Sequence, residues 1–397
     1  MSKNTHLEHL EDDILNNGSS GGKNAIAFLR ELGDMLTEKR SSLIRVTTKW
    51  DGAPAIICGK DPISGKFFVG TKSVFAKNAP KICFTNQDID MFYDEGQLNT
   101  KLKTALEHLS KLGIRGVIQG DLLFTNDKTI GTINGERVIS FRPNTITYTV
   151  PLGSSLADKI SAAKIGIVFH TRYSGPTIPE MTAGFGVDVS GLNETPDVYV
   201  TSATFADASG AANFNSEELR YYIAAVNRAE GSLKQASKFL DILTSTGESK
   251  FVMAKLFKIY FNTFIREGKK IKNAREMANQ FAMYYSSLLD KEMQLKKTVA
   301  AKNKYLKMKA DGLKFITTNQ QAIYMTVASY MNLQTAKNIV IKQLEKVKTL
   351  GTFIKTDNGY KVTAPEGFVA IKSGSALKLV DRLEFSRANF TVAKNWD

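Results

Sequence analysis

The stretch Thr48-Lys49-Trp50-Asp51-Gly52-Ala53-Pro54-Ala55-Ile56 is the most informative part of the 397-residue sequence. A lysine ends a β-like run and Asp-Gly follows shortly after it. This arrangement suits covalent catalysis, because a buried or cation-flanked lysine has a lowered pKa and attacks as a free amine. The glycine lets the backbone approach a ligand closely. The same letters also fit a surface lysine before a hairpin whose turn signal is Asp-Gly, so the stretch alone supports both interpretations.

The sequence around this stretch has the pattern of a β-rich domain. Short apolar runs between turn residues predict strands, and one helical pattern, at residues 98–112, interrupts them. The Gly/Asn/Ser/Thr-rich residues 175–215 read as a connector with one strand-like run at 198–204. The predicted strands before the connector lie at residues 43–48, 55–58, 66–70, 116–124, 138–141, 145–150 and 165–170.

Composition divides the remaining chain into a helical block between β-rich blocks. Residues 1–40 read as an N-terminal helical lead-in with a Gly/Ser break at 18–22, and residues 41–215 as the first part of a β-rich domain. Residues 216–351 contain no proline and keep helical periodicity, which predicts an all-helical domain. The β pattern returns in 352–397. We therefore predict an α+β fold, in which a domain of antiparallel sheets with helices is interrupted by a helical insertion.

The overall composition excludes several classes of protein. The sequence has 43% hydrophobic residues and no run of 18 apolar residues, which argues against a membrane span. Its polar, acidic N-terminus does not resemble a secretory signal. The two cysteines are too few for a disulfide scaffold, and the four histidines are too scattered for a multi-histidine zinc site. We expect a soluble, intracellular, cytoplasmic protein without a membrane partner, in the host cytoplasm if the protein is viral.

Positive charge is concentrated in one segment of the predicted helical domain. The chain has 53 Lys+Arg and 39 Asp+Glu, a net charge of +14, and residues 250–315 alone hold 16 Lys+Arg and five acids. Such a segment favours a polyanionic partner, because each neutralised phosphate releases counterions. It is equally compatible with the solvated face of a lysine-rich helix. The residues predicted to contact nucleic acid are Lys302, Lys304, Lys307 and Lys309.

Lys49-Trp50-Asp51-Gly52 resembles the nucleotide-accepting lysine motif of the covalent nucleotidyltransferase superfamily, which comprises DNA ligases, RNA ligases and mRNA capping enzymes. This resemblance implies that Lys49 is the nucleophile and that Asp51 and Gly52 lie at the nucleotide. Phe68-Val69-Gly70-Thr71-Lys72-Ser73 looks like the next motif, in which Lys72 would lie near a phosphate or the ribose. Val117-Ile118-Gln119-Gly120-Asp121-Leu122-Leu123 resembles the strand whose carboxylate, here Asp121, binds the ribose.

Three further segments follow in the order that the superfamily has. Ile165-Gly166-Ile167-Val168-Phe169-His170 resembles the aromatic strand, in which Phe169, or alternatively Phe141, would stack on the purine. In Pro365-Glu366-Gly367-Phe368-Val369 the resemblance assigns Glu366 to the nucleotide and its metal. Leu377-Lys378-Leu379-Val380 resembles the final lysine motif, with Lys378 at the phosphates and Arg382 nearby.

The resemblance implies an ATP-dependent polynucleotide ligase that uses Mg²⁺ and seals a 5′-phosphate to a 3′-hydroxyl through a lysyl-adenylate. Only 19 residues follow Lys378, too few for the oligonucleotide-binding barrel of capping enzymes and most DNA ligases. Bacteriophage-type RNA ligases carry helical accessory domains instead, so RNA is favoured over DNA as the substrate. In those enzymes the helical domain usually follows the catalytic domain, whereas here it lies between the aromatic strand and Glu366.

Two other functions remain open. A guanylyltransferase or a protein-modifying nucleotidyltransferase would use the same lysine chemistry on another base or acceptor. A non-catalytic nucleic-acid-binding or assembly protein with a decayed ligase fold is the second alternative. The features that favour it are Asp121, where the superfamily usually has Glu, and Val380, where it usually has a second lysine.

Overall fold

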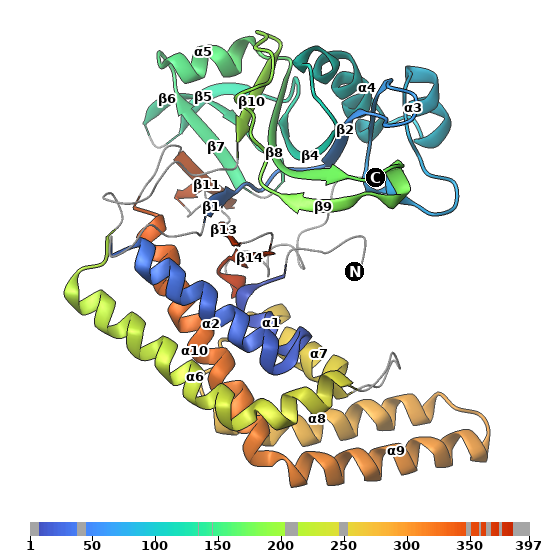
Figure 1. The fold of residues 1–397 in the computed structure, drawn as a ribbon, viewed down its shortest axis with the longest axis vertical. Coiled ribbons are helices and arrows are strands. Elements are labelled where there is room, and N and C mark those ends of the chain that lie inside the picture. The colour runs from blue at the N-terminus through green and yellow to red at the C-terminus, as the bar shows by residue number, and fades with distance from the viewer. Residues whose placement is uncertain are drawn as a thin grey trace.

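A computed structural model describes most of the chain. The described residues are 8–37, 45–133, 135–144, 146–202, 213–245, 253–346, 351–356, 359–362, 367–372 and 375–383. Within them the protein combines helices with sheets that are almost entirely antiparallel, which confirms the predicted α+β class. Figure 1 shows the β-rich part at the top and the helical part below it.

The largest sheet of the described residues has the strand order β10-β8-β4-β2-β3, with β9 also paired to β8. Its strands are antiparallel except for β10 on β8. The bounds are β2 (Ala55–Lys60), β3 (Phe67–Gly70), β4 (Val117–Phe124), β8 (Ile165–Ser174), β9 (Thr182–Phe185) and β10 (Val198–Ser202).

A second sheet has the order β12-β11-β7-β6-β5, and a third has the order β1-β13-β14. In both, strands that follow the helical block pair with strands that precede it: β11 pairs with β7, and β13 pairs with β1. The bounds are β1 (Arg45–Lys49), β5 (Thr129–Ile133), β6 (Glu136–Phe141), β7 (Ile146–Pro151), β11 (Gly351–Thr356), β12 (Gly359–Val362), β13 (Gly367–Lys372) and β14 (Ser375–Leu379).

Short helices cover the sheets of the β-rich part. Ile89 of α3 and Leu102 of α4 are buried with Ile56, Ile118 and Phe169 of the largest sheet. Ala157 and Ile160 of α5 are buried with side chains of β6 and β7. The helices and 3₁₀ turns here are η2 (Lys72–Phe75), α3 (Asn86–Phe92), α4 (Gln97–Leu109), η3 (Ser110–Leu112), α5 (Ser155–Ala162) and η4 (Ile178–Glu180).

The helical part is built around three long helices, α2, α6 and α10, which bury one continuous apolar cluster. The helices α8 and α9 pack against each other and extend away from them (Figure 1). The elements are η1 (Leu10–Asp12), α1 (Asp13–Asn16), α2 (Gly18–Met35), α6 (Ser216–Ser245), α7 (Met253–Arg266), α8 (Ala274–Gln294), α9 (Val299–Thr318) and α10 (Gln320–Leu344).

The expected Gly/Ser break at residues 18–22 is wrong, because α2 begins at Gly18 and runs through it. Close packing explains the small residues. A Cβ at Gly21 would clash with the backbone carbonyl of Asp13, and one at Gly22 would lie 2.6 Å from a methyl carbon of Leu233 in α6. The glycines therefore let α2 approach its neighbours.

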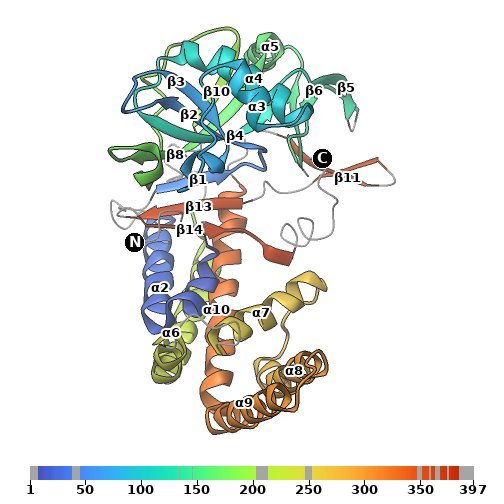
Figure 2. The same cartoon turned by 90° about the vertical axis from the view of Figure 1, so that its right-hand side faces the viewer.

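The β1-β13-β14 sheet lies between the β-rich part and the helices (Figure 2). One set of alternate side chains joins the apolar cluster of the helical part: Val46, Phe368, Ala370, Leu377 and Leu379. The other face of the sheet is therefore turned away from these helices. Among the described residues, no helix is both long and apolar enough to cross a membrane.

Candidate active site

Lys49 and Lys378 project from the same face of the β1-β13-β14 sheet. Lys49 ends β1 opposite Gly367, and Val369 of β13 is paired with residue 47 on one side and with Lys378 on the other. Directly paired residues share a face and side chains alternate along a strand, so both lysines lie on the face opposite Phe368. We refer to this side, which carries Lys49, Val369 and Lys378, as the lysine face.

The loop after Lys49 is fixed by Asp51. The backbone N–H of Asp51 donates a hydrogen bond to the Tyr148 hydroxyl at 2.8 Å. Its carboxylate accepts one hydrogen bond from the Asn144 side chain at 2.7 Å and another from the Ile146 backbone N–H at 2.8 Å. Only 4% of Asp51 is exposed. The prediction that Asp51 contacts the nucleotide is therefore corrected: its carboxylate is buried and anchors the loop to β7.

Gly52 brings this loop against β4. A Cβ at Gly52 would lie 2.6 Å from the Cβ of Asp121, so only glycine fits without displacing that residue. The Ala53 N–H donates to the Leu122 carbonyl at 2.9 Å, and the Leu122 N–H donates to the Pro54 carbonyl at 3.0 Å. The lysine-motif loop and Asp121 consequently lie side by side.

Asp121 has a neighbour that sequence analysis did not select. Nε2 of His170 lies 3.3 Å from Oδ1 of Asp121, and each side chain is 24% exposed. The pairing of β4 with β8 shifts between Gln119 and Gly120, so His170 is an extra residue in β8. Such a bulge re-aims a side chain. The sequence shows only a histidine at the end of an apolar run, which does not reveal the bulge.

The prediction that Phe169 stacks on a purine is corrected. Phe169 is 0% exposed and packs in the core beneath α3 and α4. A ring without exposed surface cannot stack on a ligand base. The alternative, Phe141, is also buried, in contact with Phe124 and Tyr148.

Lys72 lies at the surface, at the start of the 3₁₀ turn that follows β3. Because Gly70 is paired with Ile57, the chain after β3 runs toward Ala55, and Ala55 is paired with Asp121. Lys72 is thus carried toward the end of β2 where the lysine-motif loop enters the sheet.

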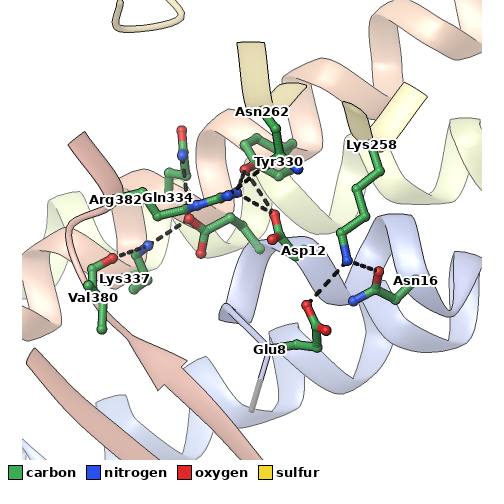
Figure 3. Close-up of polar contacts among 11 residues, drawn as sticks. Glu8, Asp12, Asn16, Lys258, Asn262, Tyr330, Gln334, Lys337, Val380 and Arg382 are labelled. Atoms are coloured by element: carbon green, nitrogen blue, oxygen red, sulfur yellow. Dashed lines mark hydrogen bonds and ion pairs between the residues drawn. The ribbon is translucent and has the colours of Figure 1, made fainter. Parts of the chain in front are cut away.

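Arg382, predicted to bind the nucleotide, is instead buried in the helical part and only 6% exposed. One guanidinium nitrogen lies 2.8 Å from Asp12 and 3.0 Å from the Tyr330 hydroxyl, and the other donates to Asn262 at 2.7 Å (Figure 3). Burial acts to lower the pKa of Arg382, but Asp12, Tyr330 and Glu11 together outweigh it and raise that pKa. Both terminal nitrogens of the guanidinium are therefore engaged inside the protein.

The buried network around Arg382 also holds the end of β14. Nζ of Lys337 in α10 lies 2.7 Å from Oε1 of Glu11, and the same ammonium donates to the Val380 carbonyl at 2.7 Å (Figure 3). The Lys378 backbone N–H donates to the carbonyl of Glu8 at 2.8 Å. Residues 8–12 and α10 therefore fix the strand that carries Lys378.

Glu366, predicted to bind the nucleotide and Mg²⁺, lies outside the described residues. Its neighbour Gly367 has a φ of +142°, and a Cβ there would clash with the Leu379 carbonyl. Steric crowding and the positive φ therefore explain the glycine of the Glu-Gly pattern. Among the described residues no three His, Cys, Asp or Glu side chains are grouped to hold a metal ion.

The lysines predicted to contact nucleic acid all lie on α9. Lys302, Lys304 and Lys307 are exposed. Lys309 differs from them, because its ammonium lies 2.7 Å from both carboxylate oxygens of Asp290 in α8. That pair holds α9 to α8 and neutralises the charge of Lys309.

Comparison with known proteins places the chain in a family without assigning it an activity. No curated protein and no solved structure matches the sequence. One family does match, and the match extends over residues 4–394, almost the whole chain. The chain belongs to this family of unknown function (DUF6267).

Proposed function

We propose that this protein is an ATP-dependent polynucleotide ligase that works through a lysyl-adenylate, with RNA ends favoured over DNA ends. The observation that supports it most is the placement of Lys49 and Lys378 on one face of the β1-β13-β14 sheet. The loop after Lys49 is packed by Gly52 against Asp121. Three residues of the ligase resemblance, distant in sequence, thus come from neighbouring elements.

In the proposed reaction the Lys49 amine attacks the α-phosphorus of ATP. The bond from phosphorus to the bridging oxygen breaks, pyrophosphate leaves, and the amine loses its proton to solvent. The charge of Lys378 stabilises the negative charge that develops on the phosphoryl oxygens. Asp121, whose carboxylate is partly exposed, accepts a hydrogen bond from a ribose hydroxyl. Nε2 of His170 lies beside that carboxylate, 3.3 Å from Oδ1.

Mg²⁺ would act as a Lewis acid at the phosphates. The carboxylate of Glu366 is the ligand that the resemblance assigns to it. No three His, Cys, Asp or Glu side chains of the described residues are grouped around such an ion, so its assignment rests on Glu366 as the resemblance gives it.

The polynucleotide is the proposed partner of α9. Its exposed Lys302, Lys304 and Lys307 would neutralise backbone phosphates without reading bases. The accessory part of the described chain is helical, as in the bacteriophage RNA ligases that the motifs resemble, and this supports RNA over DNA.

Label transfer from ATP carrying ³²P at the α-phosphate tests the proposal. The wild-type protein with Mg²⁺ should give a covalently labelled band, and Lys49→Ala should give none, because the nucleophile is removed. Lys60→Ala, at the exposed far end of β2, is the matched control and should label normally. Discharge of the label onto nicked RNA and nicked DNA would name the acceptor. Labelling by GTP but not by ATP would instead indicate a guanylyltransferase. Labelled protein acceptors would indicate a protein-modifying enzyme.

A non-catalytic polynucleotide-binding or assembly protein is the second candidate. The burial of Phe169 and Arg382 favours it, because these two predicted nucleotide contacts are used inside the protein instead. It predicts no label with either nucleotide in folded protein free of bound nucleotide, together with salt-dependent RNA binding that Lys49→Ala leaves unchanged.

A further inference from the structure

The N-terminal residues place one histidine on the lysine face. His9 forms a parallel bridge with Lys378 of β14. Its two neighbours point the other way: Leu10 is buried in the apolar cluster of the helical part, and the Glu8 carboxylate lies 3.3 Å from Lys258 of α7. Because side chains alternate along an extended segment, the His9 ring lies on the face that carries Lys378 and Lys49.

The imidazole of His9 has unused hydrogen-bonding capacity. Its Nδ1 is buried and has no hydrogen-bond partner within the described part of the chain. A neutral imidazole offers one donor and one acceptor. A buried polar group without a partner costs about 1–3 kcal/mol, so its presence calls for an explanation.

The charges that act most on His9 are those of four cations, two of which are paired with acids of the neighbouring turn. The two acids of the neighbouring turn are already engaged, Glu11 with Lys337 at 2.7 Å and Asp12 with Arg382 at 2.8 Å. The pKa of His9 is held well below its usual value of 6.5, mainly by burial and then by four cations: Arg382, Lys337, Lys378 and Lys49. A multiply charged anion is the ligand that matches such a site.

We propose that His9 binds the pyrophosphate part of the nucleotide, beside Lys378, as a phosphate-binding residue supplied by the N-terminal segment. The inference rests on the proposed function and deepens it. Phosphate oxygens accept a hydrogen bond from the ring nitrogen and offset the surrounding cations. Binding should therefore raise the pKa of His9 and be accompanied by proton uptake near pH 6.5.

Calorimetric titration with inorganic pyrophosphate and Mg²⁺ tests this inference. His9→Gln should weaken binding about tenfold, the effect of one hydrogen bond to a charged group. At pH 6.5, titration in two buffers of different ionisation enthalpy should show proton uptake in the wild type and less in His9→Gln. His108→Gln, in α4 beside Asp197, is the matched control and should bind like the wild type. Unchanged affinity and proton uptake in His9→Gln would overturn the inference.

Two further measurements separate the possible failures. If His9→Gln does not fold, NMR of histidine-labelled wild-type protein replaces it, because the chain has only four histidines to assign. Pyrophosphate should then raise the pKa of one ring that titrates well below 6.5 in the free protein, and no such change overturns the inference. A weaker affinity of His9→Gln for 5′-phosphorylated RNA alone, with normal pyrophosphate binding, also overturns it. If the wild type neither binds pyrophosphate nor becomes labelled by ATP, the proposed function itself fails.

Discussion

The two faces of the β1-β13-β14 sheet differ in the charge that they carry. The face toward the helices is apolar, and Phe368, Ala370 and Leu379 on it have 2% exposure or less. The lysine face carries Lys49 and Lys378, with His9 added at the β14 edge. A strand alternates its side chains, so three short strands can serve both purposes at once. One face fastens the sheet to the helical part, and the other presents cations.

Replacing one residue from each face should separate stability from chemistry, with the largest effect on the apolar side. Phe368→Ala should lower the free energy of unfolding by about 3–5 kcal/mol, because it leaves a cavity in the core. Lys378→Ala should cost less than about 1 kcal/mol but reduce labelling by ATP at least tenfold. Urea unfolding and the labelling rate measure the two effects. Equal destabilisation by both substitutions would contradict the division between the faces.

A smaller loss of stability should result from disturbing the contact between the lysine-motif loop and Asp121. Gly52→Ala introduces a Cβ 2.6 Å from the Cβ of Asp121 and should cost about 1–3 kcal/mol. The displaced loop should also slow labelling, on the order of a hundredfold for a shift near 1 Å. Gly131→Ala, which meets no atom within 4 Å, is the control. Normal labelling by Gly52→Ala would show that the loop position does not limit the reaction.

The lowered pKa of His9 predicts a pH dependence of stability. The unfolded chain binds a proton at His9 below pH 6.5, whereas the folded protein does not until its lower pKa is reached. Stability should therefore fall by up to about 1.4 kcal/mol per pH unit as the pH drops below 6.5. Urea unfolding of the wild type and His9→Gln at pH 7.5 and 5.5 measures the difference. If both proteins lose the same stability, His9 is not the cause.

The smallest expected effect is on RNA binding by the lysines of α9. Replacing Lys302, Lys304 and Lys307 together by Ala should weaken RNA binding and reduce the slope of log K against log salt by about 0.7 per lost contact to single strands. Lys309→Ala should leave that slope unchanged, because Asp290 already neutralises its charge. Filter binding from low to high salt measures both slopes. A wild-type slope in the triple variant would exclude α9 from the nucleic-acid interface.

The sequence predicts local structure here better than long-range contacts. The alternating apolar runs and turn residues locate β2, β4 and β8, since a strand pattern depends on neighbouring residues only. The burial of Phe169 can also be predicted from the sequence. Ile165, Ile167 and Phe169 are two residues apart, so they share one face of the strand. Even a good motif resemblance misassigns a residue when this alternation is ignored.

The parts of the site that sequence did not predict depend on distant pairings. His9 reaches the lysine face only because its backbone bridges to Lys378. Arg382 leaves that face because Asp12, Tyr330 and Asn262 offer it a buried set of acceptors. None of these partners is close in sequence, so no local sequence pattern predicts the contacts.

The ion pair between Asp12 and Arg382 joins residues that are 370 positions apart. A ribosome adding roughly 5–20 residues per second makes the second partner about 20–75 s after the first. During that interval Asp12 lacks its partner Arg382. Glu11 likewise lacks the Val380 carbonyl, which it reaches through Lys337 in the finished protein. The lysine face is thus completed only near the end of translation, and a chain that stops before Arg382 would lack the contacts that hold the end of β14.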